Sequence, residues 1–353
     1  MTTITNIKQK LRQYYRPPYF LQGLGLGIVL LALLFIWISL SGPKKVQDRL
    51  QNLDTATVRI DWSSIPESDL ESMLKDKGLD LSVQKVPLPT PDTERFLKNT
   101  PHGKIPRVSD EGVTPFQAFR KPYSPPEQAI DFPKIALVVV DYCLSEKNDK
   151  RVLDNLSSKV SLVLNPYCNN ITQKGLNARD MGHEIWLGMP METENYPVDD
   201  PGPLALKINL NVEKNLRLTQ KIMASARQYT GMVALSKPVF IQSEPDFMPI
   251  LDLIEQSGLG LFISNLKTPK FVETYTQASQ VPFANADVHL DTKLKPYNIK
   301  SRLIELERIA RQKGTAVGVL HPVPLSVNIV AQWANNLEGK ELTLVPLSAI
   351  SRR

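Results

Sequence analysis

Short apolar runs alternate with helical patterns along the chain from Phe132 onward. The runs are continuously apolar, which is typical of parallel strands that are buried on both faces of a sheet. They predict strands at 135–140, 160–164, 184–189, 231–235, 259–263, 286–291, 315–320 and 342–347. About seven or eight parallel strands with helices between them predict an α/β fold closed as a (β/α) barrel.

Two of the intervening segments, 212–228 and 299–314, show the clearest helical period. In the second segment Leu303, Leu306 and Ala310 share one face, and Gly314 stands where a helix commonly ends.

The stretch 19–40 contains 22 residues without a charge. At about 1.5 Å per residue, such a helix crosses a hydrocarbon core of roughly 30 Å. A cleavable signal peptide is the alternative, but its apolar core is shorter and a small-residue cleavage site follows it. Basic residues are more numerous before the stretch than directly after it. We therefore expect a cytoplasmic tail at 1–18, a single transmembrane helix at 19–41 in a bacterial inner membrane, and the main domain in the periplasm.

Residues 87–133 hold ten of the 28 prolines and have no sustained apolar period. Proline fixes φ and lacks the backbone N–H, so it disfavours both helices and strand ladders. We expect a proline-rich periplasmic linker over 42–131, with a small element of its own at 55–80, before the globular domain at 132–353.

Composition excludes one class of partner. The formal net charge is +6, of which the segment 1–41 contributes four positive charges and no negative one. The rest of the chain carries only the remaining +2 and shows no clustered basic face. Because nucleic-acid binding needs such a face, we expect no nucleic-acid partner.

Polar side chains follow several of the predicted strands, and the carboxyl ends of parallel strands meet at one end of a barrel. A metal-assisted hydrolase needs three nitrogen or oxygen ligands and a carboxylate that accepts a proton. Asp141, His183 and His321 could supply such a set, with Glu192 as a weaker candidate. The alternative is that both histidines are hydrogen-bonded structural residues, because the chain contains four histidines and no closely spaced ligand pair.

The order of these motifs resembles the divergent polysaccharide deacetylase family over residues of about 132–350. The similarity is carried by "KIALVVVDYCLS", "VSLVLNPYCNN", the block "GHEIWLGMPMETENYPVDDPGP", and "GTAVGVLHPVPLSVNIVAQW". The resemblance implies a distorted (β/α) barrel related to carbohydrate deacetylases, in which a divalent metal polarises the acetyl carbonyl and an aspartate acts as base.

This sequence departs from the family pattern at two expected metal ligands. The first aspartate after strand one matches Asp141, but the second position is Tyr142. The histidine expected after the fourth strand falls on Leu235, whereas the remaining histidines match His183 and His321. Two of the three expected metal ligands are thus lost, and the single imidazole left among them, that of His183, competes poorly with water for a divalent ion. We therefore expect no metal and treat His183 as a remnant ligand.

Three functional interpretations remain. The first is a catalytically impaired, pseudoenzyme-like protein that binds an envelope glycan or a periplasmic protein. The second is an active hydrolase that deacetylates an envelope polysaccharide with a non-standard site on Asp141, His183 and His321, in which case zinc would be its metal. The third is a structural envelope protein whose barrel docks other proteins.

The residues after the same strands suggest a disulfide bond and a sugar-binding surface. Cys143 and Cys168 follow neighbouring parallel strands, which lie about 4.8 Å apart, so a disulfide is within reach in an oxidising compartment. The alternatives to a disulfide are that the two cysteines remain separate thiols, packed as small apolar groups, or that they bind a metal. Tyr142, Tyr167 and Tyr196 lie in loops at this end and could stack on sugar rings. The alternating residues Asp287, His289 and Asp291 share one face of a strand, which we interpret as a solvated edge.

Overall fold

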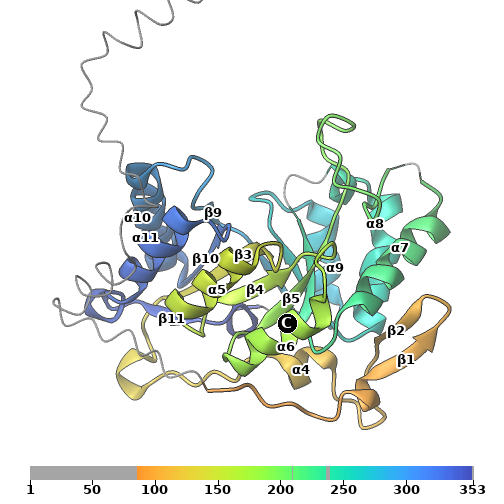
Figure 1. Ribbon diagram of the computed structural model, residues 1–353, viewed down its shortest axis with the longest axis horizontal. Coiled ribbons are helices and arrows are strands. Elements are labelled where there is room, and N and C mark those ends of the chain that lie inside the picture. The colour runs from red at the N-terminus through yellow and green to blue at the C-terminus, as the bar shows by residue number, and fades with distance from the viewer. Residues whose placement is uncertain (1–85, 209, 236–238, 352–353) are drawn as a thin grey trace, which may run out of the picture. The chain divides into compact units, whose positions relative to one another are not determined.

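The computed structural model describes residues 86–208, 210–235 and 239–351 (Figure 1). All of them belong to one compact unit of the chain, Asp80–Arg353. The predictions of a cytoplasmic tail at 1–18, a transmembrane helix at 19–41 and a small element at 55–80 therefore concern residues outside the described ranges. Within the described ranges, no helix has the length and apolar character needed to cross a membrane.

The predicted parallel α/β architecture is present as a curled sheet. Eight strands follow one another in the order β8-β7-β6-β5-β4-β3-β10-β9, and every neighbouring pair is parallel. Their bounds are β3 (Lys134–Tyr142), β4 (Ser161–Leu164), β5 (Ile185–Met189), β6 (Gly231–Ala234), β7 (Gly260–Ile263), β8 (Phe283–Asn285), β9 (Val288–His289) and β10 (Thr315–Leu320). A further strand, β11 (Thr343–Val345), pairs in parallel with the first residues of β3.

The predicted strand at 286–291 is shorter than expected, because the chain changes partners within it. β8 pairs with β7, whereas β9 pairs with β10 at the other end of the sheet. Only Ala286 and Asp287 separate the two strands. The backbone N–H of Ala286 bonds to Ile263 O at 2.9 Å and that of Asp287 to Val317 O at 2.9 Å, so one short segment links the two ends of the curled sheet.

Each strand is apolar on both sides because the two sides face different parts of the core. Alternate residues of β3, such as Ile135, Leu137 and Val139, pack in the cluster that contains the helices. Ala136 and Val138 face the sheet interior, together with Trp186 of β5. This two-sided burial is the physical reason for the continuous apolar runs.

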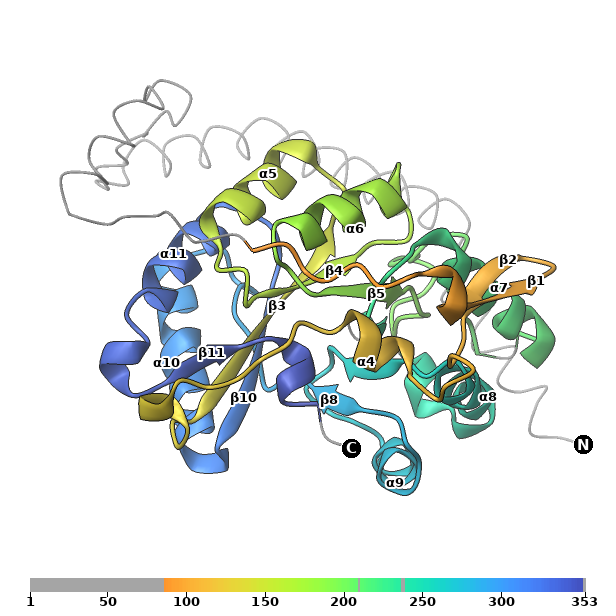
Figure 2. The same ribbon diagram turned by 90° about the horizontal axis from the view of Figure 1, so that it is seen from below.

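Helices connect most of the strands and cover the sheet from outside (Figure 2). They are α5 (Glu146–Asn155), α6 (Ile171–Asp180), α7 (Val212–Ser225), α8 (Glu244–Gln256), α9 (Lys270–Ala278), α10 (Pro296–Lys313) and α11 (Pro324–Ala334). The two clearest sequence predictions correspond to α7 and α10. As expected, Leu303, Leu306 and Ala310 are buried, and α10 ends at Gly314 in the left-handed conformation with φ 78°.

The described part of the predicted linker is not a free spacer. Residues 86–131 run along the domain and form the hairpin β1 (Leu97–Thr100)–β2 (Gly103–Pro106) and the short helix α4 (Pro115–Phe119) (Figure 2). Phe96, Phe116 and Phe119 are buried there, and the Phe116 ring meets the Trp186 ring edge-on with centroids 6.3 Å apart. Proline prevents regular ladders but not packing, so the prediction of an extended linker was wrong over this range.

Candidate functional site

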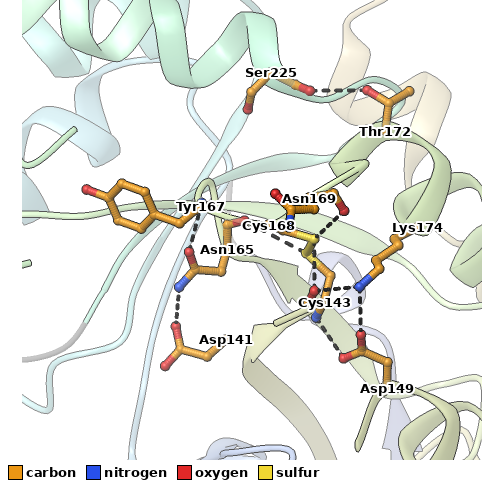
Figure 3. Close-up of a disulfide and its surroundings, with 10 residues drawn as sticks. All are labelled: Asp141, Cys143, Asp149, Asn165, Tyr167, Cys168, Asn169, Thr172, Lys174 and Ser225. Carbon is orange, nitrogen blue, oxygen red and sulfur yellow. Dashed lines mark hydrogen bonds and ion pairs between the residues drawn. A yellow bond between two sulfur atoms is a disulfide. The ribbon is translucent and has the colours of Figure 1, made fainter. Parts of the chain in front are cut away.

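Asp141 lies at the carboxyl end of β3, where the strand departs from regular geometry. The pairing of β3 with β4 shifts register between Val139 and Tyr142, and Asp141 has a positive φ of 56°. Such a conformation is uncommon for a residue with a side chain, although aspartate adopts it more readily than most, and residues in it cluster at functional sites. The Nδ2 of Asn165 donates to Asp141 Oδ1 at 2.8 Å, which fixes one carboxylate oxygen (Figure 3).

His321 follows the neighbouring strand β10 and is held by Asp291. The Nδ1 of His321 lies 3.0 Å from Asp291 Oδ1, and its backbone N–H donates to Asp291 Oδ2 at 2.8 Å. Ser326 Oγ also donates to Asp291 Oδ2 at 2.8 Å. With Nδ1 committed to Asp291, the other ring nitrogen, Nε2, points toward Asp141 and lies 3.9 Å from its Oδ2.

This arrangement shifts two pKa values. The hydrogen bond and charge of Asp291, with a contribution from Asp141, raise the pKa of His321 above 6.5 despite partial burial. Burial alone would raise the pKa of Asp291, but hydrogen bonds from His321 and Ser326 together hold it below its ordinary value. The pair therefore favours the protonated form of the His321 imidazole together with the ionised form of the buried Asp291 carboxylate.

Asp141 and His321 open into a cavity of about 390 Å³ at the carboxyl ends of the strands. This volume is within the range of roughly 300–1,000 Å³ that is usual for small-ligand sites. Its wall includes polar side chains from Asn165, Tyr167, Asp200 and His289, and apolar ones from Met191 and Leu235.

Asp291 was missed by the sequence analysis. It is 7% exposed and supports His321, so the interpretation of 287–291 as a solvated edge is wrong for this residue. His289 lines the cavity, and its Nε2 lies 2.6 Å from Ser264 O. Asp287 accepts a hydrogen bond from Val317 N at 2.9 Å near the start of β10. The alternation of acidic and imidazole side chains was the available signal, but it does not distinguish a solvated edge from a site.

The three candidate tyrosines have different surroundings. Tyr167 lines the cavity, and its hydroxyl accepts a hydrogen bond from Leu204 N at 2.9 Å. Tyr196 is partly exposed and lies beneath Lys207, whose Nζ donates to its hydroxyl at 2.8 Å, but it does not line the cavity wall. Tyr142 is 2% exposed and packs in the outer core, where burial raises the pKa of its hydroxyl. Tyr142 is therefore not available to a sugar, because the irregular end of β3 turns it inward.

His183 and Glu192 do not join Asp141 and His321. His183 precedes β5, so it lies at the amino end of the parallel sheet, opposite the end that holds Asp141. It is fully buried, with Nδ1 2.9 Å from Val160 O. Glu192 follows β5 and accepts a hydrogen bond from Ile208 N at 2.7 Å, which ties its loop together. The predicted set of Asp141, His183 and His321 is thus reduced in the structure to Asp141 and His321.

A disulfide joins the loops that follow β3 and β4. Cys143 and Cys168 are bonded, with their Cα atoms 5.8 Å apart (Figure 3). Cys143 has a positive φ of 81°, and Asp149 Oδ1 accepts a hydrogen bond from its N–H at 2.9 Å. Lys174 Nζ donates to Cys143 O at 2.9 Å. The bond therefore lies two residues beyond Asp141 and directly after Tyr167.

The side chains around the cavity do not match the metal ligands that the family resemblance requires. Leu235 contributes an apolar side chain to the wall, Tyr142 is turned into the core, and His183 lies at the other end of the sheet. Within the described ranges, no group of three or more His, Cys, Asp or Glu side chains has the arrangement of a metal site. The remaining groups can form hydrogen bonds and exchange protons.

With the curled parallel sheet and its cavity described, sequence comparison identifies the family of this protein. The chain belongs to the divergent polysaccharide deacetylase family, whose pattern matches residues 137–351. It is 20% identical over 218 residues to the uncharacterized protein YibQ of Escherichia coli K12, covering 62% of this chain and 67% of that protein.

Two solved structures are also similar. The uncharacterized protein ATU2773 from Agrobacterium tumefaciens C58 superimposes with a TM-score of 0.66 and 27% identity, covering 70% of this chain and 99% of that one. The Bdellovibrio bacteriovorus peptidoglycan deacetylase Bd3279 matches with a TM-score of 0.35 and 11% identity, covering 81% of this chain and 73% of that one. At this last score the similarity does not establish a shared fold or substrate.

Proposed function

We propose that this protein is a catalytically impaired member of its family that binds an envelope glycan. In this proposal residues 19–41 anchor it in the inner membrane of a bacterium and the main domain is periplasmic. The observation that supports glycan binding without metal is the composition of the cavity. Asp141, Tyr167 and His321 line it as polar contacts, whereas Leu235 occupies a position where the family pattern has a ligand.

The chemistry of the cavity suits a sugar. Asn165 and Asp141 offer hydrogen-bond partners to hydroxyl groups, and the Tyr167 ring with Met191 and Leu235 offers apolar surface to the ring carbons. Sites of this kind combine mostly apolar walls with a few fixed polar groups. A periplasmic protein is the alternative partner at the same surface.

The test measures metal content, deacetylation and glycan binding on the full-length chain. We expect no stoichiometric zinc, no release of acetate from acetylated amino sugars, and binding to envelope glycan fragments that Tyr167→Ala weakens. Tyr297→Ala, which removes an exposed tyrosine outside the cavity wall, is the matched control. Stoichiometric zinc that depends on His183, or acetate release that depends on Asp141, would overturn the proposal.

The second candidate function is active hydrolysis, and the Asp291–His321–Asp141 arrangement supports it. In such a reaction Asp141 Oδ2 would accept a proton from the attacking water, and protonated His321 would donate one from Nε2 to the leaving amine, giving acetate and a free amine. His183 would not contact the substrate. Acetate release that is lost in both Asp141→Asn and His321→Gln would favour this candidate.

The location is tested separately. We expect the full-length chain to remain with inner membranes after alkaline extraction and to become sensitive to added protease only when the outer membrane is permeabilised. Recovery in the soluble fraction would contradict the membrane anchor at 19–41.

A further inference from the structure

The described residues that line the cavity include negatively charged side chains but no strongly basic ones. Among the described residues that line it, Asp141 and Asp200 are carboxylates, and none is lysine or arginine. In a metal-dependent relative, an ion would balance the charge at the end of the first strand. Here Leu235 contributes an apolar side chain to the wall, and such a side chain cannot bind an ion.

One oxygen of Asp141 is available to a ligand. Its Oδ1 accepts the hydrogen bond from Asn165, whereas its Oδ2 has His321 Nε2 at 3.9 Å, beyond hydrogen-bond range. The Asp141 side chain is 37% exposed, so a bound molecule can reach it.

His321 offsets only part of this negative charge. Nδ1 of its ring lies at hydrogen-bond distance, 3.0 Å, from the buried carboxylate of Asp291. An imidazolium at His321 is therefore already paired with an anion that is nearer than Asp141. Lys207 is also engaged outside the cavity wall, where it donates to the Tyr196 hydroxyl at 2.8 Å. A cation at Asp141 Oδ2 would therefore offset the negative charge of the Asp141 carboxylate.

We propose that the sugar bound in this cavity is de-N-acetylated, with its primary ammonium on Asp141 Oδ2. This inference rests on the proposed glycan-binding function and names the chemical class of the ligand. An ammonium brings a positive charge and three N–H donors. An acetamide brings one N–H and no charge, and it would desolvate the Asp141 carboxylate without a compensating cation. The ligand class is thus an amino sugar polymer that carries free amines.

The experiment compares three β-linked oligosaccharides of equal length by calorimetry on the full-length chain. One consists of glucosamine, one of N-acetylglucosamine and one of glucose, which has a hydroxyl in place of the amine. We expect the glucosamine oligomer to bind about twofold to fivefold more tightly than the other two, as expected for one partly exposed ion pair. Raising the salt concentration should reduce this preference, because salt screens the pair.

Two variants assign the preference to its residue. Asp141→Asn should make the three affinities equal, whereas Asp131→Asn removes the same charge from an exposed position before β3 and should retain the preference. Equal loss in both variants would mean that net charge, not Asp141, selects the ligand. If Asp141→Asn does not fold, the comparison of amine with hydroxyl at low and high salt on the unmodified chain still decides the question.

The outcomes separate this inference from the proposed function. Equal binding of all three oligomers, or tighter binding of the acetylated one, would overturn the inference and leave glycan binding intact. No binding of any of them, together with no binding of envelope glycan fragments, would overturn the proposed function.

Discussion

The Nε2 of His321 faces Oδ2 of Asp141 at 3.9 Å, across the carboxyl ends of the neighbouring strands β10 and β3. Behind the imidazole, the buried Asp291 carboxylate fixes the ring and raises the pKa of His321. The cavity thus keeps an oriented acid–base pair although the ligand positions around it have changed. Because the pKa of His321 is shifted, the surroundings of its imidazole can be measured without knowing the ligand.

The first prediction concerns pH. The pKa of His321 is raised in the folded state, so its protonation stabilises the fold below pH 6.5, and this contribution is lost as the pH rises through the folded pKa. The Asp291→Asn variant should lower the pKa of His321 and remove this pH-dependent loss. NMR titration of the imidazole resonances and urea unfolding on both sides of neutral pH would measure it.

The control for this titration is His102, which lies in the turn between β1 and β2. Its resonances should be the same in the two proteins. An unchanged His321 midpoint in Asp291→Asn would contradict the role of Asp291.

The second prediction concerns Asn165, which is 9% exposed and joins the two cavity loops. Its side chain donates to Asp141 and accepts from Tyr167 N at 3.0 Å. Asn165→Ala should lower the free energy of unfolding by about 1–3 kcal/mol, because two partly buried hydrogen bonds are lost, each worth roughly 0.5–1.5 kcal/mol. Asn336→Ala, at an exposed position near the end of α11, should change it little. Equal effects in denaturant unfolding would contradict the prediction.

The third prediction concerns the disulfide. Cys143 and Cys168 are separated by 25 positions, and closing a loop of this size typically stabilises a protein by about 2–4 kcal/mol. A reducing agent should therefore lower the unfolding midpoint. Mass spectrometry of unreduced peptides should find the two cysteine peptides joined.

The matched control is the double variant Cys143→Ser, Cys168→Ser, whose unfolding midpoint should not respond to the reducing agent. An equal response in the double variant would show that the reductant acts elsewhere.

The fourth prediction concerns Gly231, the first residue of β6. A Cβ at this position would lie 2.3 Å from Trp186 Cζ3 and 2.5 Å from Gly260 O. Gly231→Ala should therefore destabilise the domain by about 1–3 kcal/mol, as expected for overpacking. At Gly339 nothing lies within 4 Å of an added Cβ, so Gly339→Ala should be close to neutral in thermal unfolding. Equal stability of both variants would contradict the packing argument.

The fold was predictable because the strands are buried on both faces and the helices on one. Residues such as Ala136 and Leu137 face different clusters, and both must be apolar, so the sequence shows unbroken runs. The course of residues 86–131 was not predictable in this way, because single aromatic side chains such as Phe116, placed between prolines, dock without any periodic pattern.

The site was only partly predictable, for reasons that lie in local geometry. Asp141 and His321 were found because each directly follows an apolar strand. Tyr142 was misplaced because the register shift and the positive φ of Asp141 break the alternation of sides at the end of β3. His183 was misplaced because its position before a strand, not after one, puts it at the opposite end of a parallel sheet.

The short connection between β8 and β9, and the shortness of these two strands, affect how the sheet can pair with other molecules. The outermost strands contain three and two residues, and the Asp287 carboxylate accepts a hydrogen bond from the backbone of Val317 beside them. Long exposed edge strands can pair with strands of other molecules. Short edge strands offer too few backbone donors and acceptors for such pairing. The two ends of the sheet thus offer little backbone to which a strand of another molecule could pair.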